Sequence, residues 1–339
     1  MPPLVSVLMP VYNGERFLAA AIQSVLTQSF DQFEFVVVDD GSTDATPRML
    51  ADCSDPRLVI VRIEHAGLIA ALNAGLARCG GEFVARMDAD DVSHADRLTR
   101  QVEFLAADDQ VDLVTCWSGV VDQRGDVMGR MEGGVTDDML LALAGGNDVV
   151  HGSIMVRRAS LPVPAYERPP EDYRLWVRMV RARRRFFVLP EILYYFREHG
   201  DRYSLTHSQS QARGIVDVQW PLLEECFATR DLADPAVRAR LVCGYGRVAG
   251  AAYHIGDFAQ GDAARRRFLD LAGRDWNGAV EPAVRHGIEA MIWGGCPWPQ
   301  AWHLRWLEWR RRPGQWASCR NLLLTLPPVQ KIRSLRRRD

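Results

Sequence analysis

Three aspartates, Asp88, Asp90 and Asp91, crowd into one short segment directly after the apolar run at residues 82–87. In an open α/β sheet, ligands bind beyond the carboxyl ends of the strands. Carboxylates that crowd together there repel one another unless a cation lies between them. Mg²⁺ and Mn²⁺ prefer such oxygen ligands and are commonly shared with substrate phosphates. The segment therefore predicts a divalent-metal site, with a solvated turn that caps the next helix as the competing interpretation.

A second acidic pair, Asp39 and Asp40, follows the apolar run at 33–38, and glycine comes next. The turn at 10–14, after the first apolar run, would lie at the same sheet edge, so the loops converge and predict a pocket. The sequence contains neither the glycine-rich dinucleotide fingerprint after its first apolar run nor the P-loop pattern. It therefore supports neither a Rossmann dinucleotide site nor a P-loop.

Two further carboxylates, Glu171 and Asp172, stand immediately after Pro169 and Pro170. Proline suits the first turn of a helix, and the helix dipole favours ionised carboxylates there. An ionised carboxylate at the mouth of a pocket is able to act as a general base on a hydroxyl group. Plain helix-start electrostatics is the alternative, so the residues alone offer this pair only as candidates.

The elements that must position these groups alternate between strands and helices through the first 117 residues. Short apolar runs predict strands, and an apolar face that recurs at helical spacing over residues 17–26 predicts a helix after the first strand. Such alternation is typical of a mostly parallel sheet with helices on both faces, so we expect an α/β fold. The predicted strands are 4–9, 33–38, 58–63, 82–87 and 111–117.

The remainder of the chain changes character twice. Residues 118–205 are mixed, with a hairpin at 119–131, strands at 149–156 and 186–196, and a helix at 171–183. From residue 206 onward the pattern is helical, with breaks at Gly, Pro or Asp. The sequence therefore predicts an α/β domain over 1–205 and an α-helical C-terminal region over 206–339. The predicted helices of that region are 207–228, 234–255, 258–272, 279–293 and 298–311.

Charge is distributed unevenly along the 339 residues. The 41 Lys+Arg and 43 Asp+Glu give a formal net charge of −2, which argues against a general nucleic-acid binder. Residues 1–110 carry a net charge of about −9, whereas residues 301–339 carry about +8. This basic tail also holds Trp306, Trp309 and Trp316. Interfacial aromatics beside arginines suit peripheral contact with an anionic membrane, and a solvated helical face is the alternative.

The seven cysteines include no Cys-x-x-Cys pair, so a thiolate zinc site is not expected, and their scatter suits a reducing compartment. The sequence shows neither a signal-peptide pattern nor an apolar run long enough to span a membrane. We therefore expect a cytoplasmic protein, located at the inner face of the membrane if the basic tail binds there.

Four segments together resemble a family 2 glycosyltransferase of the GT-A fold, and they occur in the family's order. They are residues 5–13, 38–44, 67–73 and 88–91, and the resemblance extends over about residues 3–200. It implies a GT-A, Rossmann-like sheet and an inverting, metal-dependent sugar transfer. The donor would be a nucleotide-sugar, most often a UDP-sugar. The acceptor would be a glycan or lipid-linked molecule in cell-surface polysaccharide synthesis.

The resemblance also implies roles for individual residues. Those expected to contact the nucleotide-sugar are Pro10, Val11, Tyr12, Asp39, Asp40, Gly67, Met87 and Asp88. Those expected to hold Mn²⁺ or Mg²⁺ are Asp88, Asp90 and His199. Asp172 would be the catalytic base. Those expected on the acceptor side are Glu171, His151 and Arg197.

Two other classes of function remain open at this point. A sugar-nucleotide nucleotidyltransferase also places carboxylates and metal at strand ends, but its first loop would be glycine-rich with several basic residues, and residues 10–16 match that poorly. A non-catalytic scaffold that binds carbohydrate or membrane is the other. The intact carboxylates at 88–90 and 171–172 argue against it.

Overall fold

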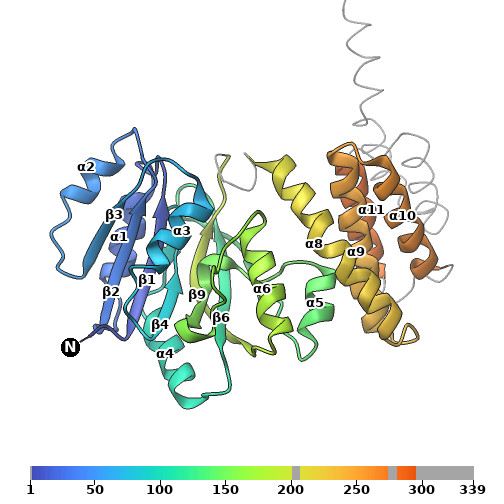
Figure 1. Ribbon diagram of the computed structural model, residues 1–339, viewed down its shortest axis with the longest axis horizontal. Helices are drawn as coiled ribbons and strands as arrows, with labels where there is room; N and C mark the ends of the chain where they lie inside the picture. The colour runs from blue at the N-terminus through green and yellow to red at the C-terminus, as the bar shows by residue number, and fades with distance from the viewer. Residues whose placement is uncertain (1, 201–206, 274–280, 295–339) are drawn as a thin grey trace, which may run out of the picture.

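The computed structural model describes residues 2–200, 207–273 and 281–294 (Figure 1). Within these residues, nine strands form one sheet in the order β3-β2-β1-β4-β8-β6-β9-β5, with β7 paired to β6. The strands are β1 (Val5–Val11), β2 (Phe33–Asp39), β3 (Leu58–Arg62), β4 (Phe83–Arg86), β5 (Val92–Ser93), β6 (Leu113–Val121), β7 (Val127–Met131), β8 (Met155–Arg157) and β9 (Phe186–Arg197). The α/β fold expected from the alternating pattern is confirmed.

The first four strands run parallel to one another, and this places their carboxyl ends at one edge of the sheet. Val11 of β1 lies opposite Asp39 of β2, and Asp39 lies opposite Arg62 of β3. β6 and β9 are also parallel, whereas β8, β5 and β7 pair antiparallel with their neighbours. The loops after β1, β2 and β4, which carry the candidate residues, therefore meet at a common edge.

Helices cover both faces of the sheet. Successive residues of a strand point to opposite sides, so each inner strand contributes apolar side chains to two cores. Leu8 of β1 belongs to the apolar core that includes Leu72 of α3, whereas Val7 and Met9 belong to the core that includes Leu18 of α1. The helices of this part are α1 (Leu18–Leu26), α2 (Thr46–Ala51), α3 (Leu68–Leu76), α4 (Arg97–Ala107), α5 (Met139–Gly145) and α6 (Glu171–Arg181).

The described part of the C-terminal region, residues 207–273 and 281–294, is helical and lies beside α5 and α6 (Figure 1). Its helices are α8 (Ser208–Thr229), α9 (Pro235–His254), α10 (Phe258–Ala272) and α11 (Glu281–Trp293). One apolar core continues from Leu143 of α5 to Leu222 of α8 and Tyr245 of α9. The helical region is thus packed directly onto the α/β part, and the boundary at residue 205 stays a prediction. Among the described helices, none has the length and apolar character that crossing a bilayer requires.

One expected strand is interrupted, and one expected helix lies outside the described residues. Residues 149–156 do not form a continuous strand, because a 3₁₀ turn at His151–Ser153 precedes the short strand β8. The expected helix at 298–311 and the basic tail with its tryptophans lie outside the described residues.

Candidate active site

The loops after β1 and β2 are joined by side-chain hydrogen bonds. Asn13 Oδ1 accepts from the Thr43 N–H at 2.8 Å, and the Asn13 N–H donates to Ser42 Oγ at 2.9 Å. The Gly14 N–H donates to Thr46 Oγ1 at 2.9 Å. These contacts hold both loops at the edge where the parallel strands end, so their positions relative to each other are fixed before any ligand arrives.

Asp40 is the buried anchor of one side of the site. Its Oδ1 accepts the Ala66 N–H at 2.8 Å, and its Oδ2 accepts the Gly67 N–H at 2.9 Å. Gly67 has φ +88°, a left-handed conformation that favours glycine and that turns the chain into α3. His65 Nδ1 lies 2.9 Å from Asp40 Oδ2, and the His65 ring stacks on Tyr12 with ring centres 4.0 Å apart. Tyr12 is 47% exposed, so one aromatic face is available to a flat ligand.

Two residues expected to bind the donor lie deeper than expected. Asp39 is buried, with Oδ1 accepting the Ser42 N–H at 2.9 Å and Oδ2 3.6 Å from Arg62 Nε. Met87 is fully buried in the core that contains α1. Both shape the loops that hold the site, and neither lines the cavity described below.

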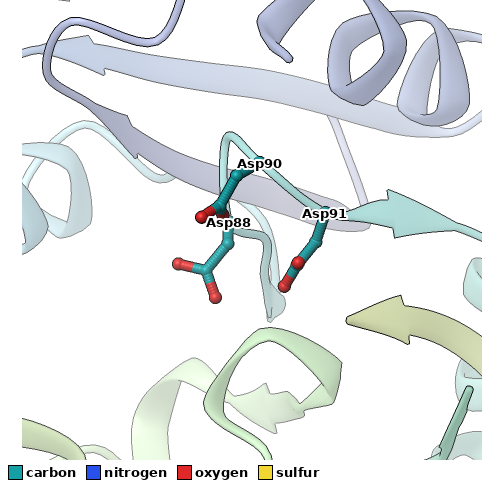
Figure 2. Close-up of side chains that lie close together, drawn as sticks. All are labelled: Asp88, Asp90 and Asp91. Carbon is teal, nitrogen blue, oxygen red and sulfur yellow. The ribbon is translucent and has the colours of Figure 1, made fainter. Parts of the chain in front are cut away.

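The three aspartates after β4 lie together, as Figure 2 shows. One carboxylate oxygen from each of Asp88, Asp90 and Asp91 lies within 4.8 Å of the others. Asp91 is buried and already paired: Tyr194 Oη donates to one oxygen at 2.6 Å, and the Arg197 N–H donates to the other at 2.7 Å. Burial, and then the charge of Asp90, raise the pKa of Asp91 to about 7. Asp91 thus fixes the loop, while Asp88 and Asp90 are more accessible.

The donor set around Asp90 fits a divalent cation. His199 Nε2 lies 2.8 Å from Asp90 Oδ2, and Asp88 is the neighbouring carboxylate. Two carboxylates and an imidazole are ligands that Mn²⁺ accepts, and a cation would offset the mutual repulsion of the carboxylates. The residues present therefore suit the metal expected from the sequence, with Asp88, Asp90 and His199 as the residues to hold it.

Arg86 connects this cluster to the second group of carboxylates. Its side chain is 4% exposed, and one guanidinium nitrogen pairs with the Asp88 carboxylate. Its positive charge also lowers the pKa values of Glu171 and Asp172, against the larger effect of burial. One buried cation is therefore shared by both carboxylate groups. No sequence pattern marks Arg86 as a site residue, although it lies two residues before Asp88.

Glu171 and Asp172 form the first turn of α6, as predicted. Glu171 is buried, and burial followed by the charge of Asp172 raises its pKa from 4.5 to about 7. Asp172 Oδ2 accepts a hydrogen bond from Asn147 Nδ2 at 2.8 Å, and Oδ1 accepts the Tyr173 N–H at 2.6 Å. Burial raises the pKa of Asp172, and the Asn147 hydrogen bond opposes that rise. A carboxylate with a raised pKa and a fixed orientation is suited to accept a proton.

His151 and Arg197, expected on the acceptor side, are engaged inside the protein. His151 is buried, its Nε2 lies 2.9 Å from Tyr166 Oη, and burial lowers its pKa well below 6.5, so it is neutral. Arg197 is buried and donates to three carbonyl oxygens, those of Asp90 at 2.9 Å, Asp122 at 3.1 Å and Gln123 at 3.3 Å. Arg197 thus ties the β6–β7 turn to the aspartate loop, and its guanidinium is already occupied.

A cavity of about 530 Å³ lies between these loops. Its lining includes most residues expected to bind the donor and the metal, and it gathers them from five separate segments of the chain. These residues are Pro10, Val11, Tyr12, Asp40, Gly67, Asp88, Asp90 and His199. The cavity is large enough for a nucleotide with a sugar, combines the Tyr12 ring with the carboxylates of Asp40, Asp88 and Asp90, and opens at the carboxyl ends of parallel strands.

This α/β sheet with a carboxylate-lined cavity suits an enzyme that binds a phosphorylated ligand with a metal ion, and comparison with known proteins gives the class as glycosyltransferases. Residues 6–162 match the model described as Glycosyl transferase family 2. The chain is 35% identical over 254 residues to the Bacillus subtilis protein named as glycosyltransferase EpsE, over 70% of this chain and 89% of that protein. It is 29% identical over 230 residues to an uncharacterized glycosyltransferase of Haemophilus influenzae, over 62% of this chain and 70% of that protein. The chain therefore belongs to glycosyltransferase family 2.

The fold is similar to that of the solved structures of S. aureus TarS. S. aureus TarS, residues 1–349 in complex with UDP-GlcNAc, superposes with a TM-score of 0.51 at 19% identity, covering 85% of this chain and 92% of that one. The full TarS structure superposes with a TM-score of 0.54 at 18% identity, covering 86% of this chain and 54% of that one. At this level of identity the likeness confirms the GT-A fold.

Proposed function

We propose that the protein transfers a sugar from a nucleotide-sugar to a hydroxyl group of a glycan or lipid-linked acceptor, with inversion at the anomeric carbon, in cell-surface polysaccharide synthesis. The observation that carries this proposal is the cavity at the carboxyl ends of the parallel strands, which is lined by Tyr12, Asp40, Asp88 and Asp90. Arg86, paired with Asp88 at the edge of the cavity, also lowers the pKa of Asp172 at the start of α6, against the larger effect of burial. A donor held by Asp88 and Asp90 would place its anomeric carbon on the side of the site that faces α6.

The donor would bind with its nucleobase at the Tyr12 end of the cavity. Tyr12 and His65 form a stacked pair there, and the Asp40 carboxylate beside them accepts N–H groups. A uracil ring offers a flat face for stacking and an N–H for a carboxylate. We therefore place UDP-sugars first among the donors, in keeping with the UDP-GlcNAc bound to TarS.

The diphosphate would lie at the Asp88–Asp90 end. Bound Mn²⁺ or Mg²⁺ would neutralise the charge that develops on the departing nucleoside diphosphate. Asp88 and Asp90 are the carboxylates that would hold the ion, and the His199 imidazole, 2.8 Å from Asp90, would be the third ligand. Arg197 and Asp91 keep this loop in place through their contacts with each other and with the Asp90 carbonyl.

Asp172 would act as the base. Its carboxylate takes the proton from the acceptor hydroxyl while the oxygen of that hydroxyl forms a bond to the anomeric carbon. The bond from that carbon to the diphosphate breaks, and the electron pair leaves with the nucleoside diphosphate. A single displacement with one base and no enzyme nucleophile inverts the configuration of the anomeric carbon. The raised pKa of Asp172 makes it a better proton acceptor than an exposed aspartate.

A panel of nucleotide-sugars tests the proposal. The full chain is incubated with UDP-glucose, UDP-N-acetylglucosamine, GDP-mannose and dTDP-glucose, with Mn²⁺ and with EDTA, and release of the nucleoside diphosphate is measured. We expect metal-dependent release from at least one donor, highest among the UDP-sugars. Release from none, together with no calorimetric binding of UDP, GDP or dTDP, would favour the non-catalytic scaffold instead.

A further inference from the structure

Asn147, in the segment between α5 and the 3₁₀ turn at His151–Ser153, is the side chain that holds the Asp172 carboxylate. Its Nδ2 donates to Asp172 Oδ2 at 2.8 Å. The two residues are 25 positions apart in the chain, so the contact exists only because α5 and α6 pack together. A hydrogen bond from an amide to a carboxylate is charge-assisted and gives the carboxylate a fixed direction.

The other end of the Asn147 side chain distinguishes it from an ordinary structural asparagine. Its Oδ1 is buried and has no hydrogen-bond partner among the described residues. Asn73, by contrast, is tied at both ends, since its Nδ2 donates to the Tyr166 carbonyl at 2.8 Å and its Oδ1 accepts the Tyr166 N–H at 3.3 Å. A buried acceptor without a partner costs stability, so packing alone does not account for an asparagine here. Its one side-chain hydrogen bond within the described residues is to Asp172.

The neighbourhood of this contact contains other unsatisfied polar atoms. Glu171 Oε2 and Arg86 Nε are also buried without a partner among the described residues. Glu171 is more than nine-tenths buried and stands directly beside Asp172. Each of these buried polar atoms lacks the hydrogen bond that such groups normally make in a folded protein, and unsatisfied groups of this kind are typical of functional sites.

We propose that Asn147 is a positioning residue for the reaction, which aims the Asp172 carboxylate at the acceptor hydroxyl and stabilises its ionised form. The inference rests on the function proposed above, because it gives the base of that reaction its partner. The amide nitrogen suits the ionised carboxylate, which only accepts hydrogen bonds. Replacing it should therefore make Asp172 harder to ionise, in addition to loosening its orientation.

The charged and titratable groups near Asp172 come from three places. Glu171 and Tyr173 flank it on α6; burial and then the charge of Asp172 raise the pKa of Glu171, and burial raises the pKa of Tyr173, which stays uncharged. Arg86 of β4 favours ionisation, and Tyr166, from the segment before α6, has a pKa far above neutrality and stays uncharged. None of these groups is changed by a substitution at Asn147, so a shift in the titration of Asp172 reports on the amide itself.

The test compares Asn147→Asp and Asn147→Ala with the matched control Asn73→Ala. The readout is the pH dependence of nucleotide-sugar hydrolysis, with water as acceptor and the most active donor of the panel above. Loss of the amide donor should move the acid limb of kcat/KM to higher pH by about one unit, and by more in Asn147→Asp, where a second carboxylate faces the first. Asn73→Ala should leave the limb at its wild-type pH, whatever its effect on rate.

A second measurement does not depend on turnover. Because the amide stabilises only the ionised carboxylate, Asn147→Ala should lower the urea midpoint of unfolding more at pH 8.5 than at pH 5. Asn73→Ala should lower it equally at both. An unshifted acid limb in both Asn147 variants, or an equal loss of midpoint at both pH values, would overturn the proposal and leave Asn147 a packing residue.

The failure of this inference is distinguishable from failure of the proposed function. If Asp172→Asn hydrolyses the donor as fast as wild type, Asp172 is not the base and both proposals fall. If Asp172→Asn is inactive while the Asn147 variants keep the wild-type pH limb, the proposed base stands and only the role of Asn147 is rejected.

Discussion

Glu171 is a buried carboxyl group whose ionisation the folded protein opposes, so replacing it by glutamine should stabilise the protein at high pH. The side chain is 7% exposed, and one of its oxygens has no hydrogen-bond partner among the described residues. Burial, followed by the neighbouring charge of Asp172, raises its pKa from 4.5 to about 7. Glutamine has the shape of the protonated acid and never carries the charge.

The sign and size follow from linkage. Between pH 4.5 and 7 the folded state of the wild type retains a proton on Glu171 that the unfolded chain has lost, so the free energy of unfolding falls as pH rises. Above pH 7 the loss is complete, and a difference of about 2.5 pH units corresponds to about 3 kcal/mol. The free energy of unfolding of Glu171→Gln, taken relative to wild type, should therefore be higher at pH 8 than at pH 4.5 by up to about 3 kcal/mol.

Urea unfolding of the full chain in EDTA, at pH 4.5 and pH 8, measures this directly. Glu167→Gln is the matched control, because Glu167 is half-exposed and pairs with Arg178 at the surface. We expect less than about 1 kcal/mol from the control at either pH. If Glu171→Gln changes the free energy of unfolding equally at both pH values, Glu171 ionises freely in the folded protein and the reasoning from burial is refuted.

Four further substitutions test the site and the structure that supports it. Tyr12→Ala should weaken UDP binding about tenfold, and His65→Ala should weaken it less, because stacking on an aromatic ring contributes on the order of 1 kcal/mol. Calorimetry that finds unchanged UDP affinity in both variants would exclude a nucleobase at this position. Asp90→Asn should abolish the gain in UDP affinity that Mn²⁺ confers, and calorimetry with and without Mn²⁺ that shows an undiminished gain would contradict the assigned metal site. Arg97→Met should lower the free energy of unfolding by about 3 kcal/mol, because the buried guanidinium donates to the carbonyls of Arg86 and Ile154. A loss of less than about 1 kcal/mol in urea unfolding would show that these carbonyls find other partners.

Local patterns in the sequence predicted the parts of the site that depend on near neighbours. The strand at 33–38 appears as β2 (Phe33–Asp39), and the helix expected to start at Glu171 does start there. In both cases the signal is confined to a few consecutive residues, an apolar run or a pair of prolines before two carboxylates. The order of the parallel strands then brings Asp40 and Asp88 to one edge without any further information.

Contacts between distant segments could not be predicted from the sequence. Asn147 reaches Asp172 across 25 positions, and Tyr194 reaches Asp88 across 106, and neither residue carries a local pattern that marks it. Met87 shows the converse difficulty. It adjoins Asp88 in the sequence, yet its side chain turns into the core, because the direction of a side chain at a strand end depends on what packs beneath it.

Packing also decides what a charged side chain does. Arg197 has the chemistry to bind a phosphate, and the sequence suggested the acceptor side for it. In the structure three backbone carbonyls already receive its guanidinium hydrogens. A buried arginine with such partners acts on the site through the loops that it joins. Arg86, which no sequence pattern marks, pairs directly with the Asp88 carboxylate and lowers the pKa of Asp172 against the larger effect of burial.

The separation of donor binding from catalysis in Asp172→Asn tests the central claim most directly. Calorimetry with the preferred nucleotide-sugar and Mn²⁺ measures the first, and release of nucleoside diphosphate measures the second, on the same protein preparation. Asp172 does not line the donor cavity, so the account predicts an affinity within about threefold of wild type and a turnover reduced at least about a hundredfold. Turnover at the wild-type rate, or a parallel loss of affinity and turnover, would contradict it.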